Sequence, residues 1–185
     1  MRSLKLPLSM NEIQSLRAGD EILLSGEILT ARDAAHLRLV NLLDTGEDLP
    51  VDLRKKTIYY VGPAPAKPGE VIGAAGPTSS YRMDELAIRL MPLGVHGMIG
   101  KGKRSDEFGK SLMSNQAVYF ATYGGAGALL ADCIKSSEVI AFADLGTEAI
   151  RCMIIQDFPV IVAMDCLGGD VYKRGEKNEG NEKHQ

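Results

Sequence analysis

The strongest constraint on the fold is the alternation of short, strand-like apolar segments with longer amphipathic ones. Residues 57–61 (TIYYV) and 117–121 (AVYFA) have the β-branched and aromatic composition of buried strands. Residues 30–43 and 83–90 repeat apolar side chains at the spacing of one helical face. Because neighbouring parallel strands are joined by crossover helices, this alternation predicts an α/β fold with a mostly parallel sheet.

The same patterns predict the remaining elements. Further strands are expected at 21–29, with a bend at Gly26, and at 70–72, 95–99, 138–142, 149–155 and 160–164. Further helices are expected near 11–16, over 105–114, and in an alanine- and leucine-rich segment ending at Ile134. Thr30 is predicted to cap the 30–43 helix, since Asp33 follows three residues later, much as in a capping box.

Length and composition favour a single globular unit. The chain has 185 residues, of which 45% are hydrophobic and 24% charged, as in ordinary globular domains. Residues 1–172 are predicted to form one domain. Residues 173–185 are polar and charged, and we expect them to form a disordered tail.

Several functional classes are disfavoured. The net charge of −3 gives no sign of nucleic-acid binding. No apolar run is long enough to span a bilayer, and the N-terminus lacks the apolar core of a secretory signal. The widely spaced Cys133, Cys152 and Cys166 suggest reduced thiols and a cytoplasmic location. They lack C-x-x-C spacing, so no metal ligands are predicted in this chain.

Two arginines are predicted at helix N-termini. Arg32 falls in the first turn of the 30–43 helix, and Arg82 falls at the start of the 83–90 helix. A cation there opposes the helix dipole, at a cost of roughly 0.3–1 kcal/mol, unless an anion shares the space. The alternative for each arginine is a side chain that points into solvent.

Two glycine-rich turns carry further polar groups. Residues 76–82 (GPTSSYR) offer adjacent hydroxyls and then Arg82, a combination suited to a carboxylate. Ser79 or Ser80 is alternatively a helix N-cap. Residues 100–104 (GKGKR) follow a predicted strand, where α/β proteins bind ligands, and Lys101 supplies a point charge.

A nucleotide site is the alternative interpretation of the second turn. Residues 97–103 match G-x-x-x-x-G-K, but Arg104 stands where a P-loop needs Ser or Thr. Residues 124–127 (GGAG) are interpreted as close helix–sheet packing, with a backbone anion site as the minority hypothesis. His36 lies on an apolar helix face and is interpreted as a buried histidine. Because anion-binding groups occur without an evident strong base or redox centre, we expect another polypeptide to complete the site.

Several motifs of this chain together resemble those of a known family. The order and spacing of several motifs are similar to those of the C-terminal domain of class I fumarases, which in many organisms is a separate β subunit. The resemblance extends to about Tyr172 and rests on residues 24–36 (LSGEILTARDAAH), 59–63 (YYVGP), 76–84 (GPTSSYRMD), 98–102 (MIGKG), 144–150 (DLGTEAI) and 157–159 (DFP).

The resemblance implies a swivelling β/β/α three-layer domain that takes part in the reversible hydration of fumarate to L-malate. It implies a [4Fe–4S] cluster bound by the partner α subunit. It assigns substrate contacts to Arg32, Thr78, Arg82 and Lys101, with Thr78 as the group that takes the proton and Lys101 as a second catalytic residue. Asp33 and Asp84 are expected to orient the arginines, and His36 to support them.

The sequence departs from the commoner family motif at Ser79, where Thr is more usual, and at Tyr81, where a small residue is more usual. L-tartrate dehydratase β subunits share the motifs around Arg32, Thr78 and Arg82. A tartrate or methylated-fumarate hydratase therefore stays open as an alternative, as does a non-catalytic anion- or nucleotide-binding module.

Overall fold

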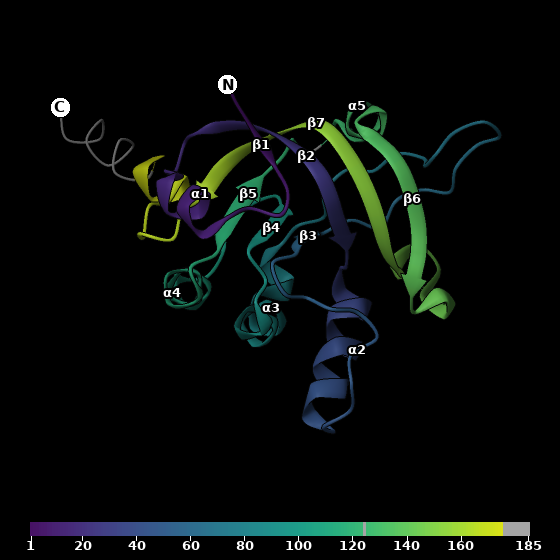
Figure 1. Cartoon of the computed structure of the whole chain (residues 1–185), viewed down its shortest axis with the longest axis horizontal. Helices are drawn as coiled ribbons and strands as arrows, with labels where there is room; N and C mark the ends of the chain where they lie inside the picture. The colour runs from purple at the N-terminus through teal and green to yellow at the C-terminus, as the bar shows by residue number, and fades with distance from the viewer. Residues whose placement is uncertain (124, 176–185) are drawn as a thin grey trace.

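Two long antiparallel strands, β2 (Glu21–Thr30) and β7 (Ile150–Met164), organise the computed structural model of this protein (Figure 1). The structure describes residues 1–123 and 125–175. Within them, the sheet order is β1-β2-β3-β4-β5-β7-β6, with an additional pairing between β2 and β7. That pairing closes β2, β3, β4, β5 and β7 into a barrel-like ring.

The remaining elements follow the predicted alternation. The other strands are β1 (Arg2–Lys5), β3 (Thr57–Tyr59), β4 (Gly97–Gly100), β5 (Val118–Ala121) and β6 (Ile134–Ala141). The α-helices are α1 (Met10–Ser15), α2 (Asp33–Asp44), α3 (Asp84–Leu90), α4 (Asp106–Asn115) and α5 (Gly127–Asp132). Short 3₁₀ helices span Tyr81–Met83, Met91–Leu93 and Ala143–Glu148.

The sheet is mixed. Strands β1 to β5 pair in parallel, as predicted, whereas every pairing of β7 is antiparallel. The fold is therefore a mixed α/β fold around a closed sheet, and the closure through β7 was not anticipated from the sequence.

Several predicted boundaries are wrong. Thr30 does not cap α2, because it is the last residue of β2 and its hydroxyl donates to Ala149 O and accepts from Arg151 N. The N-cap of α2 is Arg32. Residues 70–72 form no strand. The two strands predicted at 149–155 and 160–164 are one strand.

Strand β7 continues through Asp157 because β2 bends opposite it. The β2–β7 register shifts between Leu24 and Gly26, at the predicted bend. Asp157 has a positive φ of 50°, and its N–H donates to Ser25 Oγ at 2.9 Å. A side-chain acceptor thus satisfies the donor that the bulge removes from the ladder.

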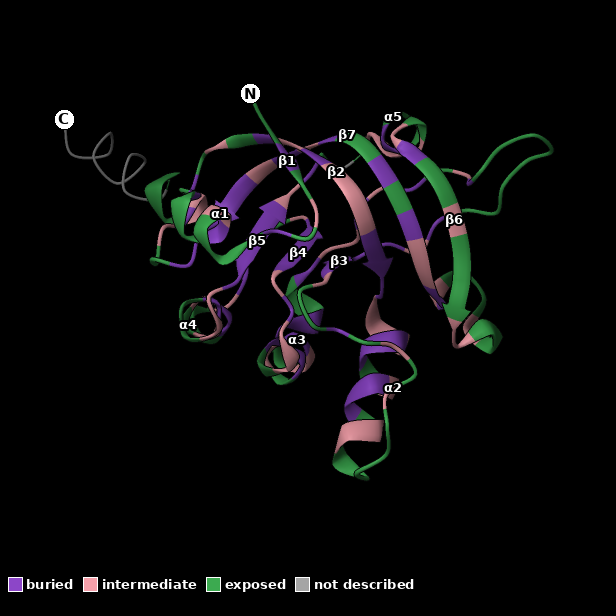
Figure 2. Ribbon diagram, viewed as in Figure 1, coloured by how far each residue is buried: buried purple, intermediate pink, exposed green. Residues whose placement is uncertain are grey.

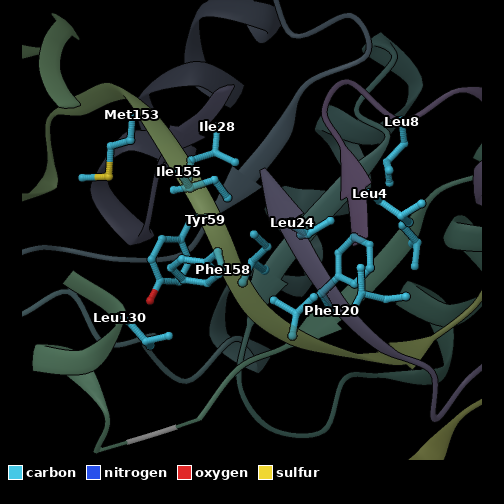
Figure 3. Close-up of a cluster of buried hydrophobic side chains, with 14 of the residues drawn as sticks. Leu4, Leu8, Leu24, Ile28, Tyr59, Phe120, Leu130, Met153, Ile155 and Phe158 are labelled. Carbon is cyan, nitrogen blue, oxygen red and sulfur yellow. The ribbon is translucent and has the colours of Figure 1, made fainter. Parts of the chain in front are cut away.

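The two faces of the closed sheet bury separate apolar clusters. Val118 and Phe120 on β5 belong to the cluster inside the ring, while Tyr119 between them belongs to the other, as strand alternation requires. Figure 3 shows part of the inner cluster, including Leu24, Phe120 and Phe158. The outer cluster lies between the sheet and helices α2, α3 and α4, which lie together below the sheet in Figures 1 and 2.

The C-terminal tail is described only in part. Residues 171–175 are helical, and the rest of the tail predicted to be disordered, 176–185, lies outside the described residues. Strand β6 is mostly exposed, as its green colour in Figure 2 shows.

In the described part of the chain, no helix is both long enough and apolar enough to cross a bilayer.

Candidate functional site

The candidate site lies where three neighbouring parallel strands end. Strands β2, β3 and β4 pair side by side and end at Thr30, Tyr59 and Gly100. Their carboxyl ends therefore lie at one edge of the sheet, where open α/β sheets bind ligands. Arg32 follows the first of these strands and Lys101 the third.

Arg32 lies against a glycine that follows β3. An ideal Cβ placed on Gly62 would lie 2.7 Å from Arg32 Nη1, so the glycine makes room for the guanidinium. Arg32 Nε lies 3.2 Å from Glu148 Oε1 and 3.6 Å from Asp33 Oδ2. The side chain therefore lies between two carboxylates and does not extend freely into solvent.

Arg82 shares Asp33 with Arg32. Its Nε and Nη2 donate to the two Asp33 carboxylate oxygens at 3.2 and 3.1 Å, a forked geometry that fixes the guanidinium plane. Nη2 also donates to Thr78 Oγ1 at 3.1 Å. Asp33 thus contacts both arginines, in the way expected of a residue that orients them.

The Thr78–Ser80 segment is tied to the ends of β3 and β4. Thr78 N donates to Tyr60 O at 2.9 Å, and Ser80 N donates to Lys101 O at 3.1 Å. The Ser80 hydroxyl accepts Lys101 N–H at 3.0 Å and donates to Thr78 O at 3.3 Å. Ser80 stands at the N-cap position of the 3₁₀ helix Tyr81–Met83, as the alternative interpretation allowed, but its side chain makes no capping hydrogen bond.

These contacts link the four predicted substrate residues, Arg32, Thr78, Arg82 and Lys101, at one edge of the sheet. The arginine side chains are 30% and 43% exposed, so both reach solvent. In the described part of the chain, no hydrogen bond or ion pair is seen at Lys101 Nζ. An edge with more cations than carboxylates and a hydroxyl among them is suited to an anion with carboxylate groups.

His36 supports the backbone of Arg32. The imidazole is 1% exposed, its Nδ1 lies 3.0 Å from Arg32 O, and its ring stands edge-on to Tyr60 at 5.2 Å. Burial lowers the pKa of His36 to about 4, because the charged form loses its hydration. The ring is therefore neutral at pH 7, and Nδ1–H is the donor to the carbonyl.

Asp84 does not orient Arg32 or Arg82, contrary to the prediction. Its carboxylate accepts Nε of Arg104 and the N–H of Ser105, the latter at 2.6 Å. Arg104 is buried against the ring of Phe108, with its Cζ 3.5 Å from the ring centroid. No pattern in the sequence indicated that Arg104, the last cation of the 100–104 turn, is buried.

The other glycine-rich features are structural. Helix α4 begins at Asp106, and its N-cap Ser105 accepts Phe108 N at 3.2 Å, so the helix start is already capped. At the second turn, Ala75 N donates to Gly127 O at 3.1 Å, so Gly127 packs against the 74–76 loop and not against the sheet as predicted. Gly124, the first residue of that turn, lies outside the described residues.

Sequence reasoning missed two members of the site. Gly62 and Glu148 both fall within motifs that carried the family resemblance, yet neither was assigned a role. Both contact Arg32, which the sequence did assign. The signal that finds them is adjacency to a functional arginine, which only the folded chain reveals.

The described residues do not fit an iron–sulfur cluster. Among residues 1–123 and 125–175, no group of three or more His, Cys, Asp or Glu side chains is arranged to hold a metal ion. Burial raises the pKa of the thiols of Cys133, Cys152 and Cys166, which disfavours the thiolate that such clusters require.

Comparison with known proteins gives the family context. The chain is 36% identical over 176 residues to a protein of Methanocaldococcus jannaschii described as a candidate L(+)-tartrate dehydratase subunit beta, covering 92% of this chain and 90% of that one. It is 33% identical over 175 residues to fumarate hydratase 2 of Leishmania major, covering 92% of this chain. It is 36% identical over 153 residues to the aerobic class I fumarate hydratase of Escherichia coli K12, covering 82% of this chain.

The coverage of these relatives differs. The chain spans only 31% and 28% of the two fumarate hydratases. The family model described as fumarase C-terminus matches residues 2–175, which is nearly all of the described chain. A match of that extent, with the cationic edge built from the motif residues, establishes that this chain belongs to the fumarase C-terminus family.

Proposed function

We propose that this chain is the β subunit of a two-subunit class I fumarate hydratase, a hydro-lyase that interconverts fumarate and L-malate and is active only with its α subunit. The observation that carries the proposal is the gathering of Arg32, Thr78, Arg82 and Lys101 at one sheet edge, where Asp33 links the two arginines, Arg82 contacts Thr78, and Ser80 links Lys101 to the same segment. The names of the relatives, which include several fumarate hydratases, support the reaction.

The cations have two tasks in this proposal. They hold the two carboxylates of a C4 dicarboxylate, for which an arginine fork is well suited. They also stabilise the negative charge that grows on a carboxylate when a proton leaves the adjacent carbon. Asp33 keeps Arg82 and Arg32 in place without neutralising the edge, because Lys101 adds a further positive charge.

Thr78 is proposed as the group that takes this proton. A threonine hydroxyl is a weak base unless it is activated. Arg82 Nη2 donates to Oγ1 at 3.1 Å, and a positive charge at that distance favours the alkoxide form. Lys101 acts beside it as the second proposed catalytic group, through its charge.

The family resemblance implies a [4Fe–4S] cluster, and we assign it to the partner α subunit. The raised pKa of the Cys133 and Cys152 thiols, which keeps them protonated, supports that assignment. Cys133→Ser with Cys152→Ser is expected to leave the iron content and hydratase activity of the complex at the wild-type level. Loss of iron from that double variant would assign ligands to this chain.

The main test is reconstitution. The chain is mixed anaerobically with its cluster-bearing partner, and fumarate hydration is measured. Arg82→Met is expected to lower kcat/KM by roughly a hundredfold or more. The matched control is Arg89→Met, an arginine on α3 whose partner is Asp44 at 2.5 Å on the exposed surface. No hydration by the wild-type complex, or equal losses in both variants, would overturn the proposal.

A tartrate hydratase is the second candidate, because the Methanocaldococcus relative is matched over 90% of its length. Relative kcat/KM values for fumarate, L-tartrate and methylated fumarate decide between them. If the chain is instead a nucleotide-binding module, calorimetry should show that it binds ATP and does not bind a dicarboxylate.

The domain type and the cellular location are part of the same proposal. We assign residues 1–172 to one swivelling β/β/α domain, supported by the helical layer α2–α4 on one side of the sheet. Three free cysteines support a cytoplasmic, reducing location.

A further inference from the structure

A buried ion pair joins the two segments that carry Arg82 and Lys101. Asp84 begins α3, two residues after Arg82, and Arg104 lies three residues after Lys101. The Asp84 carboxylate accepts Arg104 Nε through one oxygen and Ser105 N–H through the other. The Asp84 carboxylate therefore joins the two segments.

The guanidinium of Arg104 is enclosed by aromatic rings. Its side chain has no exposed surface, and its Cζ lies 3.5 Å from the ring centroid of Phe108, 4.7 Å from that of Tyr119 and 5.2 Å from that of Tyr60. Nη1 and Nη2 are buried without a hydrogen-bond partner in the described chain. Ring faces and one carboxylate hold this cation, an arrangement that a lysine cannot reproduce.

Two of the residues whose rings enclose Arg104 are also hydrogen-bonded to the site turns. Tyr60 accepts Thr78 N–H through its carbonyl, and Tyr119 OH donates to Gly102 O at 3.0 Å. A displacement of the guanidinium therefore reaches both the Thr78 segment and the Lys101 turn. Since Arg104 is buried, it acts on a bound acid only through these neighbours.

Burial separates this pair from the other ion pairs of the same helix. Arg89 and Asp44 are both about half exposed, at 51% and 52%, and such pairs contribute little because water screens them. Separating a buried pair leaves an uncompensated buried charge, which costs free energy. Asp84 and Arg104 are therefore held together more strongly than an exposed pair.

We propose that Arg104 is a positioning residue: together with Asp84 it sets the separation between Arg82 and Lys101, and so selects acids by the distance between their carboxylates. The inference rests on the dicarboxylate site of the proposed function and goes beyond it, because it assigns length selectivity to a residue that cannot touch the substrate.

The test compares Arg104→Lys with Arg89→Lys in the reconstituted complex. Dissociation constants are measured by calorimetry for malonate, succinate and glutarate, which differ in carboxylate separation, and kcat and KM are measured for fumarate. Arg104→Lys keeps the charge, so thermal unfolding is followed to verify folding. Asp84→Asn serves as a second variant, which removes the carboxylate of the same ion pair.

The expected result is that Arg104→Lys and Asp84→Asn weaken succinate binding by about tenfold to about a hundredfold. Glutarate and malonate binding should change less, so the preference for one length is reduced. KM should rise more than kcat falls, and Arg89→Lys should resemble wild type. Uniform weakening of all three acids, or a lower kcat with unchanged KM and selectivity, would overturn the inference.

The outcomes for the wild-type complex separate the two proposals. If it binds these acids but does not hydrate fumarate, the proposed reaction fails, and the selectivity of the variants still decides the role of Arg104. If it binds none of the acids, both proposals fail.

Discussion

The hydroxyl of Ser80 occupies the space beside Gly100 that a side chain would need. An ideal Cβ at residue 100 would overlap Ser80 Oγ and lie 3.0 Å from Tyr60 Cδ2. The same hydroxyl accepts Lys101 N–H, so the close approach is what ties the end of β4 to the Thr78–Ser80 segment.

Gly100→Ala is therefore expected to push this segment away from β4. Overpacking of this kind costs roughly 1–3 kcal/mol of unfolding free energy, and hydratase activity should fall with it. Gly175→Ala is the control, since its Cβ would meet no atom of residues 1–123 and 125–175 within 4 Å. Urea unfolding and fumarate turnover measure the two effects. Equal stability of the two variants would contradict the expected contact.

Gly62→Ala should affect activity with little effect on stability. The atoms that its Cβ would meet first are Nη1 and Cδ of Arg32, at 2.7 and 3.0 Å, and the end of a long side chain can move aside. We expect kcat/KM to fall because Arg32 leaves its place. A double-mutant cycle with Arg32→Met checks this: the two losses should not add if both act through Arg32.

Thr78→Val should separate proton transfer from substrate binding. Valine keeps the shape but removes the hydroxyl that contacts Arg82. We expect kcat to fall by roughly a hundredfold to ten-thousandfold, the range for loss of an acid–base group, while KM changes little. Thr78→Ser, which keeps the hydroxyl, should retain most of the activity. Wild-type kcat in the valine variant would remove Thr78 from the chemistry.

His36 should make the fold less stable in acid. Its pKa is about 4 in the folded protein, against an ordinary value of 6.5, so the unfolded chain binds the proton more readily between these values. Stability contributed by neutral His36 is present above pH 6.5 and is lost as the pH falls. The loss between pH 7 and 5 is about 2 kcal/mol.

Urea unfolding of wild type and His36→Asn at both pH values measures this contribution. Carboxylates titrate in both proteins, so the difference between them isolates the histidine. The asparagine variant should lose about 2 kcal/mol less stability on acidification. An identical pH dependence in the two proteins would show that His36 is protonated without penalty in the fold.

The elements that could be predicted from sequence are those with local signals. Apolar periodicity located α2, α3 and α4, and β-branched composition located β3, β4 and β5, because one short segment carries each signal. Predicted helix N-termini drew attention to Arg32 and Arg82, and glycine-rich turns to residues 76–82 and Lys101, but the family resemblance gave the four candidate substrate residues as a set. The fold then brought them to one edge, because the strands before Arg32 and Lys101 belong to one parallel array.

What the sequence did not predict depends on contacts between distant segments. The pairing of β2 with β7 joins residues more than a hundred positions apart, and at its bulge the N–H of Asp157 donates to the Ser25 hydroxyl. Likewise, Asp84 bonds to Arg104 because three aromatic rings from separate elements enclose that guanidinium. A motif in which Asp84 follows Arg82 by two residues does not indicate that Asp84 bonds to Arg104 instead.

The closed sheet has a consequence for how such an enzyme can be divided between genes. Arg32, Thr78, Arg82 and Lys101 are all anchored to one ring of strands that β2 and β7 close within this chain. Their spacing therefore does not depend on a peptide bond to any other part of the enzyme. We therefore expect a cut or a fusion outside the ring to leave the arrangement of these four residues intact, whether the domain is a separate chain or a covalent extension.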